Sequence, residues 1–279
     1  MKKITLYLIT VSFAMGFLSC ADSSSEKVVI VTHDDTLSEV KEEKGVPLKY
    51  DMIISDIPFP FEILDELYEK NITFNQDVLN PVSNSSKYNQ YNSKALNLGI
   101  YGADLAYAVT FEQFQQIGSY VKNTKRLAED LNIPLAFNQA MLGKYEKHKE
   151  NKDSLARAVY DSYTEVDKAL KNNEREGMAA LVVAGSWLEG LYISGKTFLD
   201  AEKNDKNKTL YKTISGQKES LTIIIKLLNE YNSDPFISKL NTELKEIRAV
   251  YTGMAIDEKG LMILHEKVAK LRKNIVDGL

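Results

Sequence analysis

Two long segments of the chain are apolar on nearly every side, and they constrain the fold more than any other feature. They read KALNLGIYGADLAYAV (residues 94–109) and GMAALVVAGSWLEGLYISG (residues 177–195), and each carries a single acidic residue, Asp104 in the first and Glu189 in the second. A helix that is apolar all round has no face suited to water, so it belongs in the centre of a domain. We therefore predict that these two segments form the central helices of the fold.

Small residues recur at every fourth position in both segments: Ala95, Gly99 and Ala103 in the first, and Ser186, Gly190 and Ser194 in the second. Such stripes let two helix backbones approach closely, which offsets the roughly 1 kcal/mol that a helical glycine costs relative to alanine. We predict that the two helices pack directly against each other. The alternative is that the second segment crosses a membrane, but Glu189 near the bilayer centre would cost about 2.5–3.5 kcal/mol, which favours the core helix.

Most of the chain after Pro60 is also typical of helices, because apolar residues recur with a period of 3.6 between short polar links. Asp153 and the pair Asp234-Pro235 are typical helix starts. The pattern predicts an all-α fold, a single domain of about eight helices packed around the two central ones, over residues 47–279. One strand pair, residues 28–32 with residues 51–56, is the only other regular structure we expect.

The N-terminus has the pattern of a signal peptide, with Lys2 and Lys3 followed by a short apolar run. The run ends at FLSC, which resembles a lipobox, in which Cys20 receives a lipid and becomes the new N-terminus after removal of residues 1–19. Cys20 is the only cysteine, so it has no partner for an internal disulfide, which favours lipidation. By resemblance to other lipoproteins, Ala21 instead of Asp after the cysteine implies the outer membrane. Residues 20–46 are mostly polar and charged and predict a flexible tether.

The charge of the mature chain argues against a nucleic-acid partner. Removing residues 1–19 takes away two of the 35 basic residues and none of the 39 acidic ones, which leaves 260 residues with a formal charge of −6. Nucleic-acid binding requires a basic surface that contacts phosphates.

The segment GLYISGKT (residues 190–197) matches the letters of a phosphate-binding P-loop. A working P-loop joins a buried strand to a helix, and its backbone amides surround the phosphates. Here the match lies inside a continuous helical pattern, and bulky residues occupy the positions where the loop must curl. We therefore predict a chance match and no nucleotide partner.

The histidines predict neither a metal site nor a cofactor. His33, His148 and His265 are far apart in the sequence, and none belongs to a motif with metal-ligand spacing. We expect all three to be solvated surface residues.

The two acidic residues of the central helices are the candidates for a site. Tyr101 and Tyr107 lie three residues to either side of Asp104, and Tyr192 lies three residues after Glu189, so each carboxyl has phenols on its own helix face. In one interpretation the acids are buried and hydrogen-bonded, and they set the register of the helices. In the second they line a binding pocket together with Trp187 and the tyrosines. In a third they are the acid and base of a glycosidase.

Three motifs, IPFPFE (residues 57–62), NLGIYGADLAYA (residues 97–108) and GSWLEGLY (residues 185–192), occur in this order. They resemble the recurring motifs of a family of all-helical lipoproteins of Bacteroidota to which no activity has been assigned. The resemblance implies export and a helical fold, and it transfers no catalytic residue.

The sequence thus predicts an exported helical lipoprotein, anchored through the lipid on Cys20 to a membrane of the cell envelope, on its periplasmic or surface face. We expect it to bind a ligand or an envelope protein without catalysis. The alternatives are an enzyme of hydrolytic type that uses Asp104 and Glu189, and a structural subunit of an envelope complex.

Overall fold

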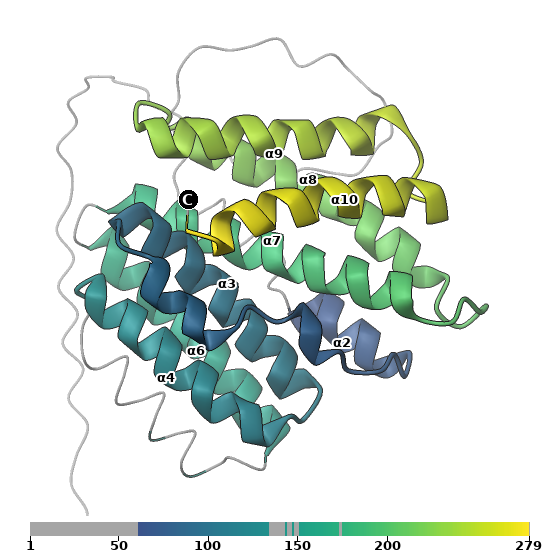
Figure 1. The fold of residues 1–279 in the computed structure, drawn as a ribbon, viewed down its shortest axis with the longest axis horizontal. Helices are drawn as coiled ribbons and strands as arrows, with labels where there is room; N and C mark the ends of the chain where they lie inside the picture. The colour runs from purple at the N-terminus through teal and green to yellow at the C-terminus, as the bar shows by residue number, and fades with distance from the viewer. Residues whose placement is uncertain (1–60, 134–142, 144–146, 148–150, 173–174, 279) are drawn as a thin grey trace, which may run out of the picture. The chain divides into compact units, whose positions relative to one another are not determined.

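The computed structural model describes residues 61–133, 143, 147, 151–172 and 175–278 (Figure 1). The chain divides into two units, residues 1–46 and residues 47–279, and all described residues lie in the second. The signal peptide, Cys20, the tether and the expected strand pair therefore fall outside the described residues.

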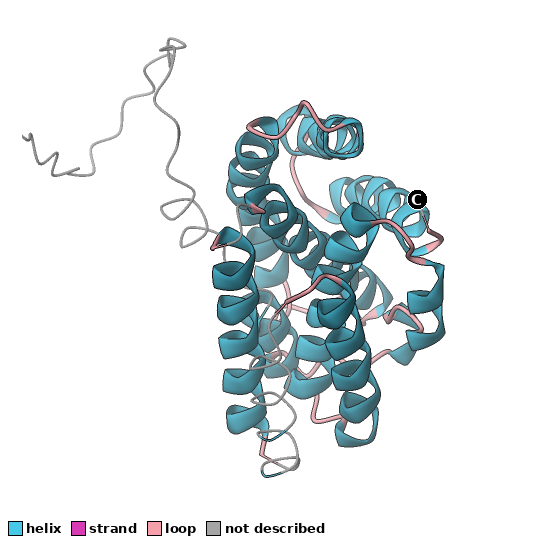
Figure 2. Cartoon of the chain, turned by 90° about the vertical axis from the view of Figure 1, so that its left-hand side faces the viewer, coloured by secondary structure: helices cyan, strands magenta, loops and turns pink. Residues whose placement is uncertain are grey.

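The described part of the chain consists of helices and loops, without a strand, which confirms the predicted all-α fold (Figure 2). Its eight α-helices and two short 3₁₀ helices are, in chain order, α2 (Phe61–Glu69), η1 (Gln76–Val78), η2 (Val82–Lys87), α3 (Tyr91–Thr110), α4 (Phe114–Asp130), α6 (Lys152–Lys171), α7 (Glu176–Asp200), α8 (Thr209–Asn229), α9 (Pro235–Gly253) and α10 (Glu258–Val276).

Helices α3 and α7 form the centre of the helical unit, as their apolar sequences predict. Every residue of α3 from Ala95 to Thr110 is buried. The two helices pack chiefly against each other; α4 and α6 cover α3, α8 and α10 pack against α7, and α9 lies against α8 and α10 (Figure 1). By length and composition α7 could span a membrane, but 78% of its most apolar window is buried in this unit, which is the pattern of a core helix.

Two of the helix starts were predicted on polar residues, with different outcomes. Asp234 caps α9 as predicted, since its carboxylate accepts hydrogen bonds from the backbone N–H groups of Phe236 and Ile237. The cap of α6 is Asn151, whose side chain accepts from the backbone N–H of Ser154, while Asp153 lies in the first turn.

Glycines let α3 and α7 touch backbone to backbone. A Cβ atom built on Gly99 would lie 2.0 Å from the carbonyl oxygen of Val182 and 2.7 Å from the backbone nitrogen of Ser186. A Cβ atom on Gly185 would lie 2.0 Å from the carbonyl oxygen of Leu96. The close packing predicted from the small-residue stripes is therefore present. On α7, however, the close contact includes Gly185, which the predicted stripe omitted.

The segment GLYISGKT lies wholly within α7. Its amides are therefore engaged along a helix and do not surround a phosphate from a loop. The side chains of Ser194 and Thr197 donate hydrogen bonds to the carbonyl oxygens of Gly190 and Ile193, one helical turn earlier. The local prediction of a helix at this segment is confirmed.

We expect Gly99→Ala to destabilise the protein by about 1–3 kcal/mol or more, because the added methyl group would meet backbone atoms that have no room to move. The matched control is Gly216→Ala in α8, where a Cβ atom would meet nothing within 4 Å. That change should stabilise by up to about 1 kcal/mol through helix propensity. Urea unfolding of both variants measures the difference, and equal effects would contradict the close contact.

Candidate functional site

The two acidic residues of the central helices meet a basic residue in the core. Asp104 and Glu189 are both fully buried, and Arg272 of α10 is 8% exposed. The Nε atom of Arg272 donates to both carboxylate oxygens of Glu189, at 3.1 and 2.9 Å, and its Nη2 atom donates to Oε1 at 2.6 Å. This fork geometry is the strongest form of ion pair that a protein side chain makes. Glu189 is therefore compensated by a cation held 83 residues away in sequence.

Asp104 lies beside this ion pair without a cation of its own. The backbone N–H of Asn80 donates to its Oδ2 atom at 3.2 Å, while Oδ1 is buried without a hydrogen bond from the described residues. Burial raises the pKa of Asp104 well above its ordinary value, and the neighbouring Glu189 raises it further, while Arg272 opposes both. The raised pKa favours the protonated form of Asp104, while Glu189 and Arg272 form the ion pair of the cluster.

Residues 75–88, which contain η1 and η2, close over the acidic pair; we call them the covering segment. Its carbonyl groups accept hydrogen bonds from the Nη2 atom of Arg272 (Val78, 2.9 Å), the hydroxyl of Tyr120 (Asn80, 3.2 Å) and the hydroxyl of Tyr101 (Pro81, 2.8 Å). These bonds satisfy backbone groups that no regular helix would pair.

An aromatic residue completes the surroundings of Arg272. The centre of its guanidinium lies 4.3 Å from the centroid of the Tyr192 ring, a cation–π contact. The same ring stacks on His265, with centroids 5.3 Å apart. Burial, and next the charge of Lys196, lower the pKa of His265 to about 4, so the imidazole is neutral near neutral pH. His265 is half-buried with its Nδ1 atom enclosed, so the expectation of a solvated surface residue is wrong for it, while His33 and His148 lie outside the described residues.

The structure brings together four of the six candidate residues: Tyr101, Asp104, Glu189 and Tyr192. Trp187 is separate, because its indole N–H donates to the side chain of Gln217 in α8 at 3.1 Å. Sequence reasoning missed Arg272, although a signal exists. Arg272 occupies a position of the apolar stripe of α10, which consists of Leu261, His265, Val268, Arg272 and Ile275 at alternating spacings of four and three.

Tyr107, the sixth candidate, contacts the start of the covering segment, beside a polar cleft. The backbone N–H of Asn75 donates to its hydroxyl at 2.9 Å, and Phe74 stacks on its ring at 4.9 Å between centroids. These two neighbours line a polar cleft of about 450 Å³ at the C-terminal end of α7. One wall of this polar cleft is residues 70–75, and the other is formed by Thr197, Asp200, Ala201, Glu202, Asn204 and Asn207.

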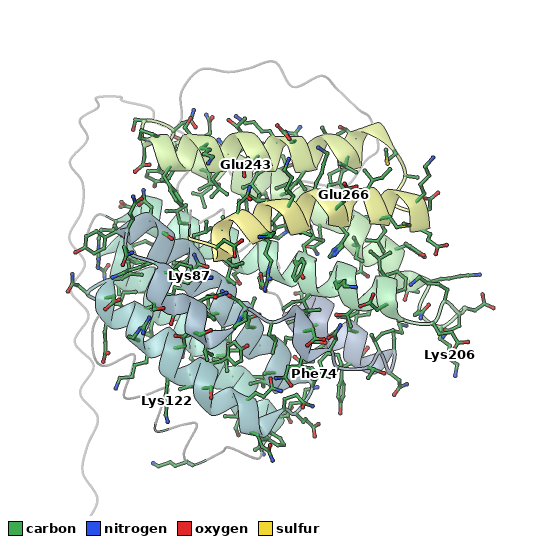
Figure 3. The ribbon with its side chains drawn as sticks, viewed as in Figure 1. Phe74, Lys87, Lys122, Lys206, Glu243 and Glu266 are labelled. Carbon is green, nitrogen blue, oxygen red and sulfur yellow. The ribbon has the colours of Figure 1, made fainter. Side chains whose placement is uncertain are left out.

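The second wall of the polar cleft is held by its own hydrogen bonds. The amide of Asn207 donates to the carbonyl of Glu202 at 2.7 Å, and Asn204 accepts from the backbone N–H of Lys206 at 2.9 Å. Asp200 is paired with Lys196 at 2.6 Å. Figure 3 shows Phe74 beside α2 and Lys206 in the loop after α7. Sequence analysis missed this cleft, because loop residues carry no periodic signal.

Comparisons of the chain with protein-family models, with curated protein sequences and with solved structures found no match. Within the described ranges, no group of three or more His, Cys, Asp or Glu residues is placed to hold a metal ion.

We expect Glu189→Gln to destabilise the protein by about 3–5 kcal/mol, because Arg272 would remain buried without a counter-charge. The double variant Glu189→Leu/Arg272→Met should be more stable than either of its single variants, since it removes both charges together. Urea unfolding of the cycle measures this coupling. Glu246→Gln, which breaks the exposed pair with Lys267, is the control and should change stability by about 0–1 kcal/mol.

The pH dependence of stability should reveal the buried proton on Asp104. The folded-state pKa of Asp104 lies above the unfolded value of about 3.9. Its favourable contribution to the free energy of unfolding is therefore fully present below about pH 4 and is lost as the pH rises toward the folded-state pKa. Asp104→Asn is neutral at every pH and lacks this decline. We therefore expect urea unfolding from acid to neutral pH to show that the free energy of unfolding of the variant, relative to that of the wild type, increases as the pH rises. Parallel curves would refute a protonated Asp104.

Proposed function

We propose that this chain is a lipid-anchored binding protein of the cell envelope, and that its ligand occupies the polar cleft. The observation that carries the proposal is the cleft itself: about 450 Å³ lined mainly by polar side chains from two chain segments. Concave sites of this size with a few converging polar groups are where proteins bind small molecules. The anchor rests on the signal peptide and on Cys20 in the sequence.

The buried acidic pair is better explained as part of the core. A carboxylate that acts on a substrate must reach it, whereas Asp104 and Glu189 have no exposed surface and both oxygens of Glu189 accept from Arg272. A glycosidase also needs room between its two carboxyl groups for the scissile bond. Here Glu189 is close enough to raise the pKa of Asp104, and both of its oxygens are bonded to Arg272. These contacts favour binding in the polar cleft over hydrolysis at the acidic pair.

The proposal is tested by a screen of small polar compounds for thermal stabilisation of the mature chain in detergent. A ligand at a hundred times its Kd stabilises by about 2.7 kcal/mol, which for a domain of this size raises Tm by roughly 5–10 °C. Thr73→Trp should abolish that shift, because it places a large side chain at an exposed position of the cleft wall. Thr242→Trp on the exposed face of α9 is the matched control and should preserve it.

Two results would refute the proposal. In one, no small polar compound stabilises the protein. In the other, a stabilising compound acts equally on the Thr73→Trp variant. The second result would favour binding at the outer helix surfaces and a role as a subunit of an envelope complex.

A further inference from the structure

We infer that the ligand of the polar cleft is a neutral molecule rich in hydroxyl groups, of which a sugar is the simplest example. This inference rests on the proposed function of the cleft and adds the chemical class of the ligand. Three properties of the cleft support it: the placement of hydrogen-bond donors and acceptors, an aromatic face, and the balance of charge.

The two walls of the polar cleft offer both hydrogen-bond donors and acceptors. Among residues 70–75 the ammonium of Lys70 only donates, while the hydroxyl of Thr73 and the side-chain amides of Asn71 and Asn75 both donate and accept. The opposite wall presents the carboxylates of Asp200 and Glu202, which accept only, beside the amides of Asn204 and Asn207. A hydroxyl group both donates and accepts, so a ring that carries several of them can bond to both walls at once.

Several of these groups are available to a ligand. The side chains of Asn71, Thr73 and Glu202 make no hydrogen bond to any other described residue. The amide of Asn75 reaches Asp200 only at 3.5 Å, a long contact that a ligand hydroxyl would improve on.

Phe74 supplies the aromatic face. Its side chain is half-buried, lines the cleft, and is held by stacking on Tyr107 with an interplanar angle of 26°. A sugar ring has a polar rim and an apolar C–H face. A fixed aromatic ring within one hydrogen-bonding wall matches both of these surfaces.

The charges around the cleft disfavour an ionic ligand. The C-terminal end of α7, together with Asp200 and Glu202, repels anions. A cation is also disfavoured, because Lys203 already donates to the last carbonyl groups of this helix, those of Phe198, Leu199 and Ala201. Lys70, Lys196 and Lys203 are balanced by Asp200, Glu202 and Glu258, the last of which acts on Lys203. A neutral ligand therefore fits without an uncompensated charge.

The test compares three related probes on the mature chain: N-acetylglucosamine, which is neutral, glucosamine, which is a cation, and glucose phosphate, which is an anion. Binding is measured by ligand-observed NMR up to millimolar concentration. We expect the neutral probe to bind and each charged probe to bind at least about tenfold more weakly.

Substitutions then locate the binding groups. Glu202→Gln should weaken binding of the neutral probe about tenfold, and Phe74→Leu about threefold to tenfold, since each removes one favourable contact and leaves the wall in place. Glu266→Gln on α10 is the control for the lost carboxylate and should leave binding unchanged (Figure 3). Asn71→Gly should also weaken binding, and glycine accepts the positive φ of 57° at this position.

The outcomes separate this inference from the proposed function. If a charged probe binds more tightly than the neutral one and Thr73→Trp abolishes its binding, the cleft is a site but the ligand class is wrong. If a probe binds and Thr73→Trp has no effect, both the inference and the proposed function fail. If none of the three probes binds, the inference is overturned, and the wider screen decides the proposed function.

Discussion

The backbone contact between α3 and α7 determines the placement of the other helices. The contacts advance along both helices together, from Gly99 against Val182 to Asp104 beside Glu189, so the two helices run in the same direction. Asp104 lies five residues after Gly99, and Glu189 four residues after Gly185, which places each acid roughly one turn beyond the close contact. A contact this close leaves no solvent between the helices, so the two acids meet inside the core.

A buried pair of acids requires compensation, and the rest of the helical unit supplies it. Arg272 brings α10 against α7, and its second bond, to Val78, fixes the covering segment over the cluster. Replacing a buried ion pair by apolar residues is often neutral or stabilising, so stability alone does not explain the cluster. What the charges do specify is position, because any other register of α10 would leave Glu189 or Arg272 buried without a partner.

The central features were predictable because they depend on periodic patterns. Apolar segments and small residues at a spacing of four are local in sequence, and each predicted a contact that the structure contains. The tyrosines beside Asp104 did not predict its hydrogen bonds, because the hydroxyl of Tyr101 donates to Pro81 and that of Tyr107 accepts from Asn75. Arg272 was missed because its partner is 83 residues away and one arginine on a lysine-rich helix does not stand out. Trp187 was misplaced because a helix that is apolar on every side does not reveal which neighbour each side chain faces. The polar cleft was missed because its walls are loops and a helix end.

The acidic cluster and the polar cleft share helices but remain separate. Glu189 and Asp200 are eleven residues apart on α7, which corresponds to roughly 16 Å along the axis. Tyr107 connects the core to the cleft, because its hydroxyl accepts from Asn75 and its ring supports Phe74. This wall of the cleft is thus held by α3, the most buried of the described helices, so the ligand that we propose would require little ordering of the wall. The buried charges set the positions of the helices, and the cleft at their end is free to vary in its loop residues without disturbing the core.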